Sequence, residues 1–201
     1  MAKLSFKYAT MNSGKTIDLI RTAYNYEENG FRVLVMKPKQ DTKGNRSLDS
    51  RIGLKRLVDI LISDDTNIIE EIQNKYTGDL KCILVDEAEL LSKEKIDELY
   101  VATKVFDIPI ICYGLRTNFK MEGFKGATRL LEIAENLEEI KTLCACGNIA
   151  RFAGRKVNGE YTSDGPEILI DGTLENVKYV PLCGDCYLTK VKKINYKKLL
   201  K

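Results

Sequence analysis

The stretch KYATMNSGKT, residues 7–16, constrains the fold of this chain more than any other segment. Its last four residues match the end of a phosphate-binding loop, in which backbone N–H groups at the start of a helix surround an anion. An alternating apolar stretch, residues 4–8, precedes the loop, and apolar residues recur at helical spacing over residues 16–29. This order of strand, tight loop and helix predicts a nucleotide site in which Lys15 reaches the terminal phosphates and Thr16 contacts magnesium.

One position departs from the usual loop pattern. The residue five places before Gly14 is usually glycine, and here it is Ala9. Alanine fits there only if its φ is negative, because a positive φ penalises a Cβ atom. The pattern alone therefore leaves open a second interpretation, in which a chance Gly-Lys-Thr begins an ordinary helix.

Asp86 and Glu87 supply an independent feature. They follow Cys82-Ile83-Leu84-Val85, a continuous apolar run that is typical of a strand buried on both faces of a parallel sheet. Acidic residues at the carboxyl end of such a strand lie on the edge where open α/β sheets bind ligands. We expect Asp86 to hold magnesium and Glu87 to accept a substrate proton, since the chain has no histidine. A solvated strand end is the alternative interpretation.

The remaining pattern predicts the architecture. Further apolar runs predict strands over residues 31–36, 56–63 and 108–113, helical patterns predict helices over 67–76 and 92–106, and the polar stretch 40–51 predicts a loop. Near residue 140 the pattern changes to short strands and turns. We therefore predict a P-loop (RecA-like) α/β domain over residues 1–140, with a parallel sheet flanked by helices, and a small C-terminal zinc-binding lobe over residues 141–201.

Four cysteines near the C-terminus form two close pairs, Cys144 with Cys146 and Cys183 with Cys186. Four thiolates can close a tetrahedral zinc site that has a structural role. Two disulfides are the alternative, which we consider weaker for a chain whose N-terminal residues lack a signal-peptide pattern. The other two cysteines, Cys82 and Cys112, lie inside apolar runs and are expected to be buried thiols.

Composition excludes several classes of protein. Apolar residues make up 44% of the 201 residues and charged residues 30%, as in ordinary globular proteins. A net charge of +3 is too small to indicate nucleic-acid or membrane binding. No apolar run approaches the ~20 residues of a membrane span. We therefore expect a cytoplasmic protein that binds neither nucleic acid nor membrane.

With these residues identified, the sequence resembles the type II thymidine kinases, in particular the bacterial branch. The resemblance covers nearly the whole chain, and its segments are residues 11–16, 50–54, 84–87, 113–119 and the four cysteines. Relatives in this branch also lack the first loop glycine, so Ala9 is consistent with a nucleotide site. The resemblance implies transfer of the γ-phosphate of ATP to the 5′-hydroxyl of thymidine, which gives dTMP for DNA precursor synthesis. It also implies a homotetramer, inhibition by thymidine triphosphate, structural zinc, and magnesium with ATP.

The family pattern also implies roles for individual residues. Glu87 would be the catalytic base, and Thr16 and Asp86 would hold magnesium. The expected contacts to ATP are Ala9, Thr10, Met11, Asn12, Ser13, Gly14, Lys15, Thr16, Asp86, Glu87, Ala88 and Glu89. The expected contacts to thymidine are Met11, Leu115, Phe119, Phe124, Glu167, Ile168, Leu169, Ile170, Asp171 and Tyr179. Residues 41–51 would form a lid over the phosphates.

Two questions about individual residues and two alternative functions remain open at this point. Phe119 and Phe124 also fit the pattern of simple core aromatics. Glu89 stands where relatives usually have glutamine, and its carboxyl group either raises the pKa of Glu87 by like charge or faces away. A nucleic-acid-binding ATPase with a zinc ribbon is the second functional hypothesis, based on the cysteines and the basic C-terminus. A zinc adaptor with an inactive loop is the third.

Overall fold

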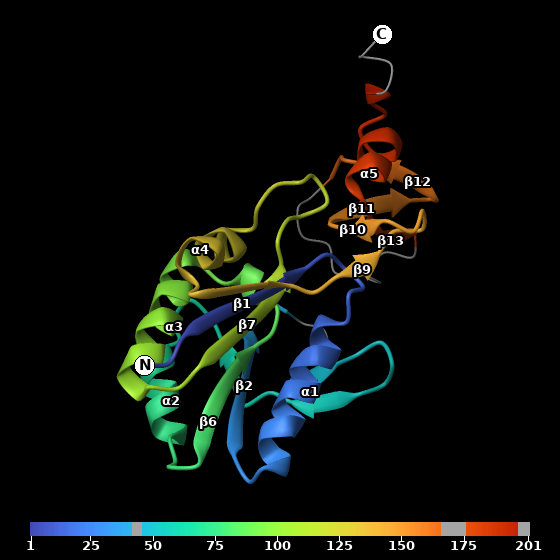
Figure 1. Cartoon of the computed structure of the whole chain (residues 1–201). Coiled ribbons are helices and arrows are strands. Elements are labelled where there is room, and N and C mark those ends of the chain that lie inside the picture. Colours follow the sequence, from blue (N-terminus) through green and yellow to red (C-terminus); the bar gives the residue numbers. More distant parts are fainter. Residues whose placement is uncertain (42–45, 166–175, 197–201) are drawn as a thin grey trace. The chain divides into compact units, whose positions relative to one another are not determined.

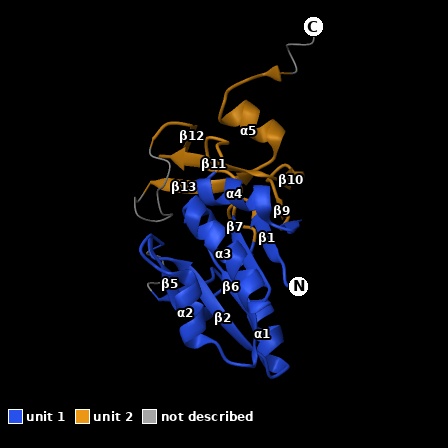
Figure 2. Ribbon diagram, turned by 90° about the vertical axis from the view of Figure 1, so that its left-hand side faces the viewer, with its two compact units in different colours: residues 1–8, 14–114, 124–139 blue, residues 9–13, 115–123, 140–201 orange. Residues whose placement is uncertain are grey.

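The computed structural model describes residues 1–41, 46–165 and 176–196 (Figure 1). It forms two compact units, which Figure 2 distinguishes by colour. Unit 1 consists of residues 1–8, 14–114 and 124–139, and unit 2 consists of residues 9–13, 115–123 and 140–201. Among the described residues, no helix combines the length and apolar character needed to cross a bilayer.

Unit 1 is built on a six-stranded sheet with the order β5-β2-β6-β7-β1-β8. The strands are β1 (Leu4–Ala9), β2 (Arg32–Pro38), β5 (Ile60–Ile62), β6 (Leu80–Val85), β7 (Ile110–Leu115) and β8 (Asn136–Glu139). The neighbouring strands run parallel, so their carboxyl ends meet at one edge of the sheet. Strand β7 lies between β1 and β6 in the sheet. Strand β1 leads into the loop that contains Gly14, called the glycine loop below, and β6 ends before Asp86. The predicted P-loop α/β fold is confirmed.

Helices cover both faces of this sheet. They are α1 (Lys15–Glu28), α2 (Ile68–Lys75), α3 (Lys93–Phe106), α4 (Lys125–Ile133) and the short 3₁₀ helix η1 (Ala88–Leu90). Connections between parallel strands are right-handed, which places α1 on one face and the packed row α2-α3-α4 on the other (Figure 1). The side chains of Asn67 and Ser92 cap α2 and α3 by accepting hydrogen bonds from backbone N–H groups in the first turn.

The segment predicted as one strand over residues 56–63 is two strands, so that prediction was wrong in detail. Strand β4 (Lys55–Leu57) pairs with β3 (Ser47–Asp49), which lies within the predicted loop, and β5 joins the central sheet. The change of partner occurs at two consecutive residues, because Val58 N donates to Arg46 O while Asp59 N donates to Val35 O. A uniform apolar pattern does not reveal such a change of pairing.

Unit 2 has little regular structure beyond a small antiparallel sheet. Its order is β12-β11-β13, formed by β11 (Phe152–Val157), β12 (Glu160–Thr162) and β13 (Val177–Leu182). A short ladder joins β9 (Thr142–Leu143) to β10 (Ile149–Ala150), and helix α5 (Gly184–Lys190) follows β13. Two buried apolar clusters hold these elements, one around the cysteines and one around Phe119.

Candidate active site

The loop between β1 and α1 has the backbone that a phosphate site requires. Asn12 and Gly14 adopt positive φ angles of 62° and 84°, and Gly14 precedes the first turn of α1 without a side-chain cap. Uncapped N–H groups at a helix N-terminus are free to bind an anion. Ala9 is the last residue of β1 and keeps an extended backbone, so its Cβ atom meets no left-handed penalty.

Thr16 and Asp86 lie together in unit 1. The Thr16 hydroxyl donates to Asp86 Oδ2 over 3.5 Å, although the two residues are far apart in sequence. Asp86 is buried and its Oδ1 atom has no hydrogen-bond partner. Burial, together with the nearby charge of Glu87, raises the pKa of Asp86 to about 7, and the positive charge of Lys15 opposes this shift. A buried carboxylate with an unpartnered oxygen beside a hydroxyl fits a hard cation such as Mg²⁺.

Glu87 lines a small cavity at the carboxyl edge of the sheet. It adopts a left-handed backbone, with φ 48° and ψ 38°, as the residue immediately before η1. A non-glycine residue in this region is strained, and such strain is concentrated at functional sites. The cavity is lined by Thr16, Asp41, Ser47, Leu48, Asp49, Asp86 and Glu87. Glu87 therefore lines the same cavity as the Thr16 and Asp86 pair.

The sequence analysis missed Lys37, near the end of β2. Its side chain is 0% exposed, and its Nζ atom lies 3.2 Å from Asp41 Oδ2 and 3.4 Å from the carbonyl oxygen of Ser47. Asp41 and Ser47 both line the cavity that contains Glu87. Lys37 therefore contacts two residues that line the cavity, Asp41 and Ser47, and helps to position them. No sequence signal distinguishes it from a lysine at an exposed strand position.

Glu89 is buried, and its carboxyl group interacts with that of Glu87, so it does not face away from Glu87. Its carboxyl group lies against β7, where a Cβ atom on Gly114 would approach Glu89 Oε2 to 2.6 Å. Burial raises the pKa of Glu89 well above its usual value, and the neighbouring Glu87 carboxyl group raises it further, with Lys15 acting in the opposite direction. Two adjacent carboxyl groups in a buried site repel each other when both are ionised, which favours the protonated form of Glu89.

The residues expected to contact thymidine are placed in different parts of the structure. Met11, Phe119 and Tyr179 pack together in unit 2, with the Phe119 and Tyr179 ring centroids 6.2 Å apart. Leu115 also belongs to unit 2, whereas the buried Phe124 precedes α4 in unit 1. The expected contacts Glu167, Ile168, Leu169, Ile170 and Asp171 lie outside the described residues.

Arg155, on β11, is a second residue that the sequence analysis missed. It is buried, and its guanidinium carbon lies 4.9 Å from the centroid of the Phe119 ring. Its Nη1 atom donates to Asp164 O over 3.4 Å. A planar cation against an aromatic face is a favourable arrangement, and it further fixes the Phe119 ring. An arginine in a short strand of irregular pattern carries no sequence signal of such a contact.

The four C-terminal cysteines form a second candidate site, which lies in unit 2. All four Sγ atoms lie within 4.8 Å of one another, and those of Cys146 and Cys183 are 3.5 Å apart. Thiolates bound at about 2.3 Å around a tetrahedral zinc ion lie about 3.8 Å from each other, so the group fits this metal. All six cysteines are free thiols in the structure, and Cys82 and Cys112 are buried as predicted.

The glycine loop before α1, the strand order and the acidic end of β6 together define a P-loop α/β protein. The family model described as thymidine kinase matches residues 2–187. The chain is 39% identical to the thymidine kinase of Mannheimia succiniciproducens over 198 residues, covering 97% of this chain and 100% of that protein. It is 40% identical to the thymidine kinase of Streptococcus gordonii, covering 93% and 96% of the two chains. The chain belongs to the thymidine kinase family.

Proposed function

We propose that this chain is an ATP-dependent thymidine kinase. Lys15 and the N–H groups of the loop from Ala9 to Thr16 bind the donor phosphates, aided by the dipole of α1. Thr16 and Asp86 would hold a magnesium ion, which would supply charge neutralisation on the phosphates. The observation that carries the proposal is that Glu87 lines the same cavity as the hydrogen-bonded Thr16 and Asp86 pair.

Glu87 acts as the general base. Its carboxylate takes the proton of the thymidine 5′-hydroxyl as that oxygen forms a bond to the γ-phosphorus, and the bond from the γ-phosphorus to the β–γ bridging oxygen breaks to release ADP. Phosphoryl transfer needs alignment and charge stabilisation more than covalent chemistry from the protein. The strained left-handed backbone at Glu87 is consistent with such alignment.

The nucleoside lies against aromatic and apolar side chains. Met11, Phe119 and Tyr179 form one packed group, which supports their shared role in contacting the base, and we extend this role to Leu115 and Phe124. The segment 167–171 grips the base, and residues 41–51 cover the phosphates. A closed loop excludes water, which would otherwise hydrolyse ATP.

The zinc ion has a structural role, because four cysteines leave no open position for water. The change of sequence pattern near residue 140 supports an ATP-binding domain over residues 1–140 and a zinc lobe over residues 141–201. We carry over from the family that Ala88 and Glu89 lie near the nucleotide. A cytoplasmic homotetramer inhibited by thymidine triphosphate completes the proposal. Size measurement in solution and inhibition assays test the last two properties.

The proposal is tested with a Glu87→Gln variant. We expect Glu87→Gln to keep ATP binding and lose about 10²- to 10⁴-fold in kcat, because general-base catalysis typically contributes that much. The control is Glu94→Gln, which makes the same chemical change at an exposed position in the first turn of α3. Unchanged turnover in Glu87→Gln would remove this residue from the mechanism.

A substrate panel distinguishes the proposed kinase from the nucleic-acid-binding ATPase. ATP consumption is measured with a set of nucleosides and with single-stranded DNA. Thymidine-dependent turnover is expected, and the family membership supports it. Turnover that depends on DNA and ignores thymidine would contradict the proposed function.

A further inference from the structure

Tyr187 links the cysteine group to the aromatic residue expected to contact the nucleoside. It directly follows Cys186 in α5 and its side chain is 0% exposed. Its hydroxyl donates a hydrogen bond of 2.6 Å to the carbonyl oxygen of Phe119, which lies 68 residues earlier in the chain. Both residues belong to unit 2, so this contact lies within one compact unit.

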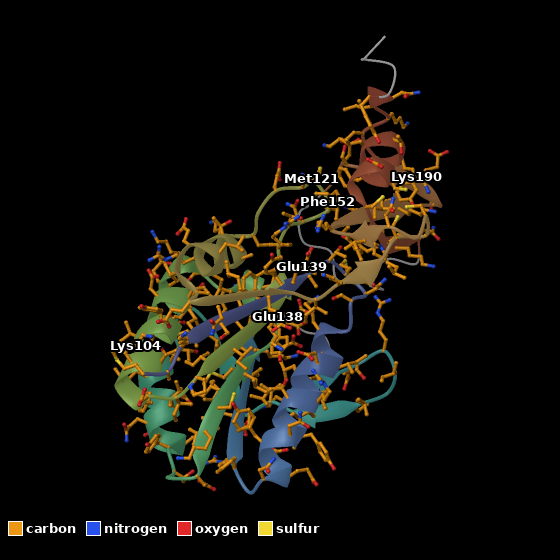
Figure 3. All side chains as sticks on the ribbon, viewed as in Figure 1. Lys104, Met121, Glu138, Glu139, Phe152 and Lys190 are labelled. Carbon is orange, nitrogen blue, oxygen red and sulfur yellow. The ribbon has the colours of Figure 1, made fainter. Side chains whose placement is uncertain are left out.

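The position of Tyr187 is set by the cysteine group. Its N–H donates to Cys183 O over 2.9 Å, and its ring belongs to the same buried cluster as Cys144 and Cys183. The Phe152 ring, labelled in Figure 3, packs against it with centroids 5.6 Å apart. The tyrosine ring is therefore held by the elements that carry the thiols, and only its hydroxyl extends toward Phe119.

Phe119 lies in a loop with few regular backbone bonds of its own. The loop is closed by a bridge between Thr117 and Gly123, and Asn118 Oδ1 accepts from the N–H groups of Lys120 and Glu122. These contacts shape the turn but leave the Phe119 carbonyl to Tyr187. A buried carbonyl that loses its donor is left unsatisfied, which is costly and shifts the backbone that bears it.

We propose that Tyr187 is a positioning residue for the nucleoside, because its hydroxyl fixes the Phe119 backbone relative to the metal-binding cysteines. This inference rests on the proposed function and adds a role for the zinc lobe within it. Zinc binding then orders α5, α5 holds Phe119, and Phe119 receives thymidine. Metal and nucleoside must consequently stabilise each other's binding, since coupling between two sites is reciprocal.

The test is a Tyr187→Phe variant, which removes the hydroxyl and keeps the ring. We expect KM and the calorimetric Kd for thymidine to rise about tenfold, with kcat and the KM for ATP within about twofold of wild type. Zinc content stays at about one ion per chain. The control is Tyr161→Phe, because Tyr161 packs against the same cluster and no role in binding is assigned to it. This control is expected to leave all five quantities unchanged.

Two results would overturn the inference. One is a folded, zinc-loaded Tyr187→Phe protein with unchanged affinity for thymidine. The other is loss of zinc from that variant, which would place the effect at the metal. If the variant does not fold, the wild-type protein provides the test. Saturating thymidine should then slow zinc transfer to a chelator at least twofold, and an unchanged rate rejects the coupling. Wild-type protein without thymidine-dependent turnover would instead reject the proposed function itself.

Discussion

The pKa values of single side chains at this site depend on burial and on neighbouring charges. The family resemblance implies glutamine at position 89, where this chain has Glu89 in a buried position against Gly114 and beside Glu87. A protonated carboxyl group offers one donor and one acceptor, as an amide does, so the neutral acid can replace glutamine there. The substitution therefore introduces a dependence on pH that an amide would not have.

This dependence predicts how Glu89→Gln changes stability. The native pKa of Glu89 is raised above its usual value of 4.5, so the native state binds this proton more tightly than the unfolded state. The contribution of Glu89 to the free energy of unfolding is therefore most favourable at low pH. It falls as the pH rises from about 4.5 toward the native pKa. Glu89→Gln should be more stable than wild type at pH 8, and this advantage should shrink at pH 5.

Thermal unfolding across this pH range checks the prediction. A gain in Tm of about 2–4 °C per kcal/mol is expected for a chain of this size. Exposed Glu94→Gln serves as the control and should show no such trend. An equal effect of Glu89→Gln at pH 5 and pH 8 would mean that Glu89 is ionised in the native state.

Among the elements, the turn that carries Glu87 depends on close packing against α4. A Cβ atom on Gly126 would lie 2.5 Å from the Ala88 carbonyl oxygen and 2.7 Å from that of Leu91. These are backbone atoms, which cannot move aside as a flexible side chain can. Gly126 thus lets α4 approach η1 closely enough to fix the turn after Asp86.

Gly126→Ala should therefore push α4 away from η1. We expect a loss of about 2–3 kcal/mol in the free energy of unfolding and a fall in kcat, because overpacking at a rigid backbone contact strains the fold. Gly78→Ala is the matched control, since a Cβ atom there meets nothing within 4 Å. Denaturant unfolding and turnover measure both variants, and equal stability of the two would contradict the packing argument.

The two compact units of the molecule differ in the extent of their buried cores. Unit 1 has a core of buried strands, whereas the described residues of unit 2 form a three-stranded sheet, a two-stranded ladder and two small buried clusters. A small lobe with little core draws much of its folding energy from a bound metal. We therefore expect a metal bound at the cysteine group to contribute much of the folding free energy of unit 2.

Removal of zinc by a chelator should unfold unit 2 and leave unit 1 folded. Hydrogen exchange is expected to increase in β11 and β13 while β2, β6 and β7 stay protected, because the sheet of unit 1 contains no cysteine from the group. Metal analysis before chelation should give about one zinc per chain. Loss of protection in both units at once would show that they unfold together.

Several structural features of this protein could be predicted from local patterns in the sequence. The glycine loop, the apolar run before Asp86, the capping residues Asn67 and Ser92, and the close cysteine pairs are all visible in the sequence and present in the structure. Each of these features lies within a few residues of chain, where spacing and periodicity express the backbone conformation directly. Parallel order followed from the alternation of strands and helices, which allows few other topologies.

Only the tertiary structure decided which distant side chains meet. The Lys37 contact to the cavity wall, the position of Glu89 against Gly114 and the bond from Tyr187 to Phe119 have no local signature. The change of strand partner at Val58 was hidden for the same reason. A side chain's partner and its pKa depend on what the rest of the chain packs against it, and burial is a property of the folded whole.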